Sequence, residues 1–227
     1  MDLIPERQTL GGRAVLLCGD PDAPTLLVQP ADVHDLDALA EEVAHIRALA
    51  EGIPFCLAAF QVDDAYRELS PWPAPPIFGA EAFAGCAGET LDWLDRALLP
   101  ALAAGRRRAC IGGYSLAGLF ALYAACEREA FAGAAGVSPS VWFPGWLEYI
   151  RDRAPRAGKI YLSLGDREER ARNPVLRAVG DNIRAMYARL DGTGSADAVL
   201  EWNPGNHFRD PALRTAKGFA WLLKALE

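Results

Sequence analysis

A serine with small residues two positions before and after it lies in the segment Gly113-Tyr114-Ser115-Leu116-Ala117. The apolar run 108–114 precedes this serine, and the all-apolar run 116–126 follows it. We expect the first run to form a strand and the second a buried helix, with Ser115 at the tight turn between them. Such a turn exposes the hydroxyl above a sheet, which suits a nucleophile. A buried serine in a structural turn is the alternative.

The tight turn requires small flanking residues because larger side chains would collide with each other and with neighbouring strands. Gly113 and Ala117 meet this requirement, and Gly118 follows directly. The turn also points the first helical N–H groups, chiefly that of Leu116, at the position where an oxyanion would form. The segment therefore predicts a serine nucleophile with one backbone donor beside it.

A base must accept the serine proton, and histidine titrates in the range that suits this role. The chain contains three histidines. His34 and His45 fall at the start and in the middle of a predicted helix, where a structural role is expected. His207 follows the last predicted strand, in the turn-forming loop 203–208. In the strand–serine–helix context the order along the chain is serine, acid, histidine, which selects His207.

The orienting acid is expected after the predicted strand 159–164. The loop there contains three carboxylates, Asp166, Glu168 and Glu169. Asp166 lies closest to the strand end, whereas Glu168 is better placed to fold back over Ser115 and meet the imidazole. We favour Glu168 and keep Asp166 as the alternative acid. Either carboxylate would fix the imidazole tautomer and stabilise the imidazolium.

A second oxyanion donor is expected from the loop after the predicted strand 54–60, where Gln61 or Val62 could present its N–H. The same loop contains Trp72, and the segment after the predicted strand 131–137 contains Trp142. These two indole rings are candidates to line a substrate cleft, although packing in the core or at the rim is an equal alternative.

Short apolar runs alternate with longer segments of helical period, which predicts a mostly parallel sheet flanked by helices in one α/β domain over 1–227. The runs 13–18 and 25–28 flank a turn and are expected to form a hairpin or adjacent strands. A short segment between 131 and 159 indicates little or no cap domain. The remaining predicted strands are 54–60, 108–114, 131–137, 159–164 and 199–202, and the predicted helices are 32–51, 89–104, 116–126, 173–190 and 211–226.

The composition is that of a soluble domain, with 51% hydrophobic residues and a formal net charge of −7. This charge argues against nucleic acid or an anionic membrane as partner, and the basic run 106–108 is expected to be a solvated turn. No apolar stretch reaches the roughly 20 residues of a membrane span. The first twelve residues lack the features of an export signal, so a cytoplasmic location is expected.

Five cysteines are present, and none of them shows the C-x-x-C spacing that metal or redox sites favour. We expect reduced structural thiols and no metal site.

Several segments together resemble small bacterial members of the esterase D-like branch of the α/β hydrolases, which is related to enterochelin and feruloyl esterases and mycolyltransferases. They are GGYSLAGLFALY, DDAYRELSPWPAPPIFG, GVSPSVWFPGWLEYI, SLGDREERARNPVL and WNPGNHF. The resemblance covers nearly the whole chain and implies the α/β-hydrolase fold, with serine-dependent hydrolysis of a small-molecule ester and no cofactor. In that family the acid is often a Glu in a G-x-x-E context, which residues 165–168 match.

The predicted reaction is hydrolysis of a carboxylic ester through an acyl-enzyme. An acyltransferase with the same three residues, in which a bound alcohol replaces water, is the first alternative. A non-catalytic binding protein of the same fold is a second, disfavoured alternative, because serine, acid and histidine all occur in the required order.

Overall fold

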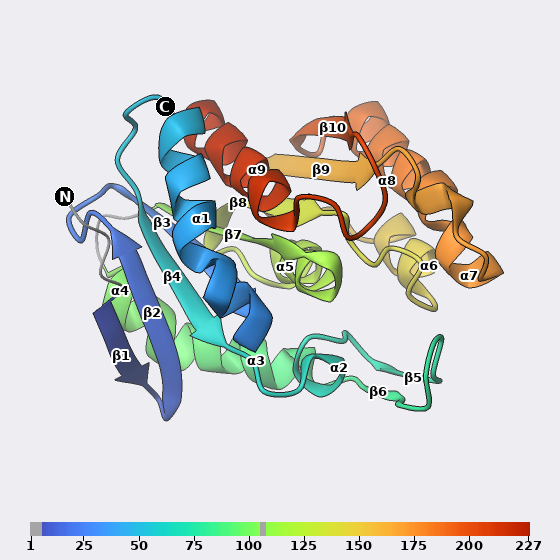
Figure 1. The fold of residues 1–227 in the computed structure, drawn as a ribbon, viewed down its shortest axis with the longest axis horizontal. Helices are drawn as coiled ribbons and strands as arrows, with labels where there is room; N and C mark the ends of the chain where they lie inside the picture. The colour runs from blue at the N-terminus through green and yellow to red at the C-terminus, as the bar shows by residue number, and fades with distance from the viewer. Residues whose placement is uncertain (1–5, 105–107) are drawn as a thin grey trace.

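In the computed structural model, residues 6–104 and 108–227 are described. Most of the basic run 106–108 and the first five residues of the amino-terminal segment therefore lie outside the described part of the chain. Within that part, one large twisted sheet forms the centre of the molecule (Figure 1). Among the described helices, none has both the length and the apolar character that crossing a bilayer requires.

The large sheet has the strand order β1-β2-β4-β3-β7-β8-β9-β10. Strand β2 runs antiparallel to both of its neighbours, and every other neighbouring pair is parallel. The prediction of a mostly parallel α/β sheet is therefore confirmed. The strands are β1 (Glu6–Leu10), β2 (Arg13–Gly19), β3 (Thr25–Ala31), β4 (Cys56–Gln61), β7 (Arg108–Tyr114), β8 (Phe131–Val137), β9 (Lys159–Gly165) and β10 (Asp197–Asn203).

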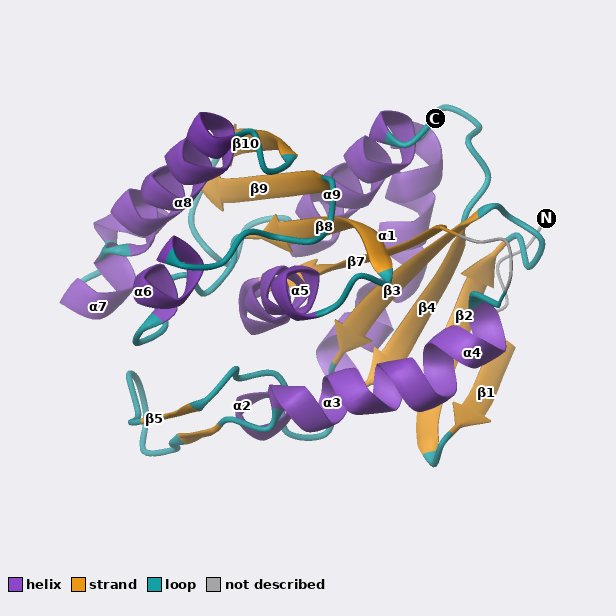
Figure 2. Ribbon diagram, turned by 180° about the vertical axis from the view of Figure 1, so that it is seen from behind, coloured by secondary structure: helices purple, strands orange, loops and turns teal. Residues whose placement is uncertain are grey.

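Helices cover both faces of this sheet. In Figure 1 α1 (Val33–Leu49) and α9 (Pro211–Ala225) lie side by side over the near face. Figure 2 shows the helices of the opposite face. These are α3 (Ala87–Trp93), a π-helical turn (Leu94–Leu98), α4 (Leu99–Leu102), α5 (Ser115–Glu127), α6 (Trp146–Arg151) and α8 (Val179–Thr193).

Short elements in three connections complete the fold near the carboxyl ends of the parallel strands. The long connection after β4 contains α2 (Ala65–Glu68) and a two-stranded ribbon, β5 (Pro73–Ala74) with β6 (Phe83–Ala84). A 3₁₀ turn (Glu168–Arg170) and α7 (Pro174–Arg177) follow β9. Between β8 and β9 the described chain forms only the six-residue helix α6, so little cap covers this end of the sheet.

The expected pairing of the runs 13–18 and 25–28 is wrong. These runs are β2 and β3, and β4 lies between them in the sheet. The observed hairpin joins β1 to β2 through Gly11 and Gly12, which have φ values of +54° and +84°. Glycine adopts such values without the steric cost of a side chain, so the Gly-Gly pair was the hairpin signal in this region.

Most predicted helices are confirmed, and local chemistry explains where they begin. The side chain of Asp32 accepts the N–H groups of His34 and Asp35 and begins α1, while Asp35 bonds back to the N–H of Asp32. This reciprocal capping box satisfies donors that a helix start otherwise leaves free. Helix α5, which is apolar on all sides, is buried along most of its length, since it packs on β7 and β8 and its side chains join the main core cluster. The helix predicted over 173–190 is divided into α7 and α8.

One buried carboxyl group stands out in the layer between α1 and the sheet. Glu42 is 5% exposed, and its Oε2 accepts a hydrogen bond from Gln29 Nε2 at 3.3 Å. Burial raises the pKa of Glu42 to about 8, and the bond from Gln29 offsets only part of this effect. The folded protein therefore holds this carboxyl largely neutral near pH 7.

We predict that Glu42→Gln raises the free energy of unfolding by roughly 4 kcal/mol at pH 8 and much less at pH 5. Between the ordinary pKa of 4.5 and about 8, the folded chain binds a proton that the unfolded chain has released. Wild-type stability therefore falls as pH rises through this window, and the glutamine removes the fall. Urea unfolding of the wild type and of Glu42→Gln at pH 5 and pH 8 measures this difference in the free energy of unfolding. Glu41→Gln, which changes the exposed carboxylate next to Glu42, is the control. An unchanged pH slope in Glu42→Gln would contradict the assignment.

Candidate active site

Ser115 lies at the junction of β7 and α5 with a backbone φ of +56°. A non-glycine residue in this region is strained and needs surrounding structure to hold it. A Cβ added at Gly113 would lie 2.7 Å from the Cβ of Ala117, and one at Gly118 would lie 2.8 Å from the carbonyl oxygen of Gly113. The small residues around the serine are thus required by the turn itself.

Three side chains from separate parts of the chain form a continuous hydrogen-bonded series at this turn. His207 Nε2 lies 3.1 Å from Ser115 Oγ, and His207 Nδ1 lies 2.7 Å from Glu168 Oε2. Ser115 comes from the β7–α5 junction, Glu168 from the 3₁₀ turn after β9, and His207 from the loop after β10. With Nδ1 donating to the carboxylate, Nε2 is free to accept the serine proton.

The carboxylate of Glu168 is 5% exposed and accepts several further hydrogen bonds. Its Oε1 accepts from the Ser138 hydroxyl at 2.7 Å, from the Gly165 N–H at 2.7 Å, and from Arg214 Nη1 at 3.3 Å. Burial alone would raise the pKa of Glu168, but the hydrogen bonds from His207, Ser138 and Gly165 outweigh burial and lower it. The group is therefore ionised at neutral pH and able to stabilise an imidazolium.

The other two carboxylates of the same loop bond elsewhere. Asp166 Oδ1 accepts the backbone N–H of Gly205 at 2.8 Å, which ties the loop after β9 to the loop of the histidine. Glu169 Oε2 accepts from Arg184 Nη2 at 2.8 Å on the surface. The structure thus places Glu168, and neither of its neighbours, against the imidazole of His207.

Two further residues, Arg214 and Tyr114, hold Glu168 and the loop of His207 in place, and the sequence did not single them out. Arg214 on α9 is 2% exposed, and its guanidinium also reaches Tyr114 Oη at 3.2 Å and donates to the Pro204 carbonyl at 2.8 Å. Tyr114 Oη donates to the carbonyl oxygen of His207 at 2.6 Å. An arginine on the apolar face of the closing amphipathic helix was the signal that could have found this contact, because buried cations need partners.

The expected second oxyanion donors, Gln61 and Val62, make no contact with Ser115 in the described structure. Val62 lines the cavity of Ser115, but its N–H donates to the carbonyl oxygen of Ala31 at 2.9 Å and so continues the pairing of β3 with β4. Gln61 lines a different cavity, on the other side of the connection after β4. The N–H of Leu116 belongs to the first turn of α5, where backbone donors have no partner within the helix.

The physical reason for this error is the strand order. The strand beside β7 is β3, not β4, and the parallel register pairs Val28 with Ile111. Continuing that register along both strands brings Asp32, the residue after β3, level with Ser115. The loop beside Ser115 on this side therefore begins at Asp32, which lines the same cavity as Ser115 and His207.

A cavity of about 890 Å³ opens beside Ser115 and His207, within the size range of small-molecule sites. Four aromatic side chains line one side of it, and we call them the aromatic wall: Tyr66, Phe78, Phe83 and Trp142. The expected role of Trp142 is compatible with this position. Trp72 does not line the cavity; its Nε1 donates to the Pro144 carbonyl at 2.8 Å and its ring packs against neighbouring aromatic rings.

Solved structures with a similar arrangement show which fold this is. An IroE-like serine hydrolase from Shewanella oneidensis has a TM-score of 0.79 at 15% identity, with 100% of this chain and 81% of that chain covered. The siderophore hydrolase EstA from Aspergillus nidulans has a TM-score of 0.74 at 15% identity, with 99% and 95% covered. The chain has the α/β-hydrolase fold.

The enterobactin esterase FES from Shigella flexneri has the same fold over 100% of this chain and 60% of that chain, with a TM-score of 0.69 and 18% identity. No family model matches the sequence, and no curated protein matches it. At these identities the similarity establishes the fold, and the chemistry must be argued from the site itself.

We predict that Glu168→Gln slows labelling of Ser115 by a fluorophosphonate by about 10²- to 10⁴-fold, because the imidazole loses its orienting carboxylate. Glu169→Gln is the matched control, since it removes the adjacent carboxylate on the same turn, which bonds to Arg184 instead. Labelling rates are measured by intact-mass spectrometry. Equal rates for Glu168→Gln and the control would exclude Glu168 as the orienting acid.

Proposed function

We propose that this protein hydrolyses a carboxylic ester of a small molecule, with Ser115 as nucleophile, His207 as base and Glu168 as orienting acid. The observation that carries the proposal is the series of hydrogen bonds from Ser115 Oγ through His207 to Glu168 at the strained β7–α5 turn. A buried structural serine would need neither the strained backbone nor a histidine held by a carboxylate.

In the first step His207 Nε2 takes the proton of Ser115 as its oxygen attacks the ester carbonyl carbon. The tetrahedral intermediate collapses when the imidazolium returns that proton to the leaving alcohol, which leaves an acyl-enzyme. Water then attacks the acyl carbon, giving its proton to His207, and the second collapse restores the serine and releases the acid. Glu168 keeps its negative charge throughout and stabilises the imidazolium.

The oxyanion requires two donors beside the serine, and we propose the N–H groups of Leu116 and Asp32. Leu116 is supported by its place in the first turn of α5, and Asp32 by the register of β3 against β7. The Asp32 N–H is at present bonded to Asp35 Oδ2 at 3.2 Å, a long contact for this type of bond. An ester oxygen would compete with that carboxylate for the donor.

The substrate is proposed to bind with an apolar or aromatic part against the aromatic wall. Flat aromatic side chains favour stacking and edge contacts with aromatic groups of a ligand. Among the similar structures, one is named a siderophore hydrolase and another an enterobactin esterase. Siderophore esters therefore belong in the first substrate panel, beside p-nitrophenyl esters of graded acyl size.

We predict that Ser115→Ala abolishes hydrolysis of p-nitrophenyl esters and labelling by a fluorophosphonate, while the unfolding temperature changes little. The matched control is Ser140→Ala, because Ser140 Oγ lies only 3.4 Å from Ser115 Oγ, whereas the imidazole bonds to Ser115. The control should keep most of its labelling. Full labelling of Ser115→Ala would contradict the proposal, and ester products formed with added alcohols would indicate acyl transfer instead.

A further inference from the structure

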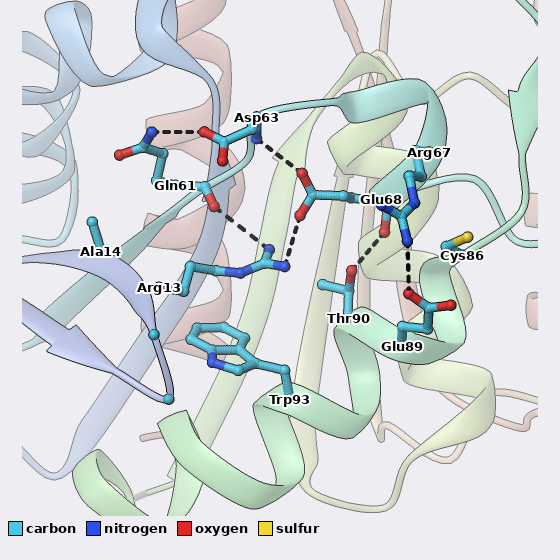
Figure 3. A pocket seen from close by; sticks show the side chains of 12 residues that line it. Arg13, Ala14, Gln61, Asp63, Arg67, Glu68, Cys86, Glu89, Thr90 and Trp93 are labelled. Carbon is cyan, nitrogen blue, oxygen red and sulfur yellow. Dashed lines mark hydrogen bonds and ion pairs between the residues drawn. The ribbon is translucent and has the colours of Figure 1, made fainter.

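A second cavity, of about 590 Å³, lies between the β1–β2 turn, the connection after β4, and α3 (Figure 3). Its charged and polar side chains bind one another rather than facing open space. The pairs are Arg13 with Glu68 at 2.7 Å, Arg67 with Glu89 at 3.3 Å, and Gln61 with Asp63 at 2.7 Å. This mutual satisfaction favours a structural network over a ligand site.

Arg13 is held in a fixed direction by the residues around it. Its guanidinium carbon lies 4.8 Å from the ring centroid of Trp93 and 5.6 Å from that of Phe60. Figure 3 shows the side chain reaching from β2 across the indole ring of Trp93 toward Glu68. The Arg13 side chain is only 22% exposed, and Glu68 17%, so solvent screens their ion pair less than it screens a surface pair.

Both carboxylate oxygens of Glu68 have partners: one contacts the guanidinium of Arg13, and the other accepts two backbone N–H groups. Oε2 contacts Arg13, while Oε1 accepts the N–H groups of Asp63 at 2.9 Å and Asp64 at 3.0 Å. The hydroxyl of Thr90 on α3 donates to the carbonyl oxygen of Glu68 at 2.8 Å. Arg13 therefore fixes, through one carboxylate, both the start and the end of the short helix α2.

The opposite side of α2 belongs to the catalytic cavity. Tyr66 on this helix is part of the aromatic wall, and its ring centroid lies 4.9 Å from that of Phe83 and 6.0 Å from that of Phe78. Phe78 in turn contacts Trp142 with centroids 5.7 Å apart. A four-residue helix has little stability of its own, so its position depends on such outside contacts.

We propose that Arg13 is a positioning residue that sets the selectivity of the catalytic cavity for bulky esters. Through Glu68 it holds α2, and through Tyr66 it holds the aromatic wall, although Arg13 itself lines only the second cavity. This inference rests on the proposed ester hydrolysis. The second cavity thus influences which substrates are recognised, although no substrate needs to enter it.

The test compares Arg13→Met and Glu68→Gln with Arg67→Gln, which removes a positive charge from the same cavity but breaks the exposed pair with Glu89 and the contact with Cys86 instead of the pair between Arg13 and Glu68. With a p-nitrophenyl ester of an aromatic acid, we expect KM to rise about tenfold in the first two variants. With p-nitrophenyl acetate, we expect kcat and fluorophosphonate labelling to stay within about twofold of wild type. Arg13→Lys, which keeps the charge, should recover part of the lost selectivity.

A second readout does not depend on catalysis. Hydrogen exchange of peptides covering 63–84 should become faster in Arg13→Met and Glu68→Gln and stay unchanged in Arg67→Gln. The double variant Arg13→Met/Glu68→Gln should equal the more severe single variant, because Arg13 acts on α2 through Glu68.

The inference is overturned if Arg13→Met behaves like Arg67→Gln in both readouts, if it slows acetate and aromatic esters equally, or if the two changes are additive. Should Arg13→Met fail to fold, Arg13→Lys and Glu68→Gln decide the question. If wild type hydrolyses no ester, the proposed function fails, and hydrogen exchange still shows whether the pair holds α2.

Discussion

The backbone of Ser115 is held in a left-handed conformation, and the rest of the site depends on this constraint. Such a conformation costs about 1 to 3 kcal/mol in a non-glycine residue, so surrounding structure must impose it. Strand β7 lies within the sheet, with a strand on each side, and α5 is buried along its length. Gly113 and Gly118 provide the space that lets these two elements meet at so sharp a turn.

With the hydroxyl fixed above the sheet, the loops after β9 and β10 need to supply only a base and an acid. Glu168 ties these loops together, because its carboxylate binds His207, the loop after β8 through Ser138, and α9 through Arg214. This carboxylate is thus a junction of three segments, and in the proposed reaction it also orients the base. The pKa of Glu168 is lowered because the hydrogen bonds from His207, Ser138 and the Gly165 N–H outweigh burial, so the carboxylate stays ionised beside His207 at neutral pH.

The serine turn, the histidine and the short set of acids could be predicted because each depends on local signals: a small-residue pattern, a turn-rich loop and a strand end. The hairpin and the second oxyanion donor could not, because both depend on strand order, which long-range pairing determines. Gln61 and Val62 follow β4, whereas the neighbour of β7 is β3, and only the folded sheet shows this difference. The buried role of Arg214 was equally hidden, since only the folded sheet shows what faces α9.

In the proposed reaction an acyl group is transferred to Ser115, and acid quenching of the wild-type protein during turnover traps this acyl-enzyme. Peptide mapping by mass spectrometry, after mixing with a slowly hydrolysed p-nitrophenyl ester, locates the acyl group. We expect one acyl group per chain, on the peptide that contains Ser115, and we expect it to disappear as turnover ends. Turnover with no acylated peptide, or with the acyl group on another residue, would contradict the proposed reaction.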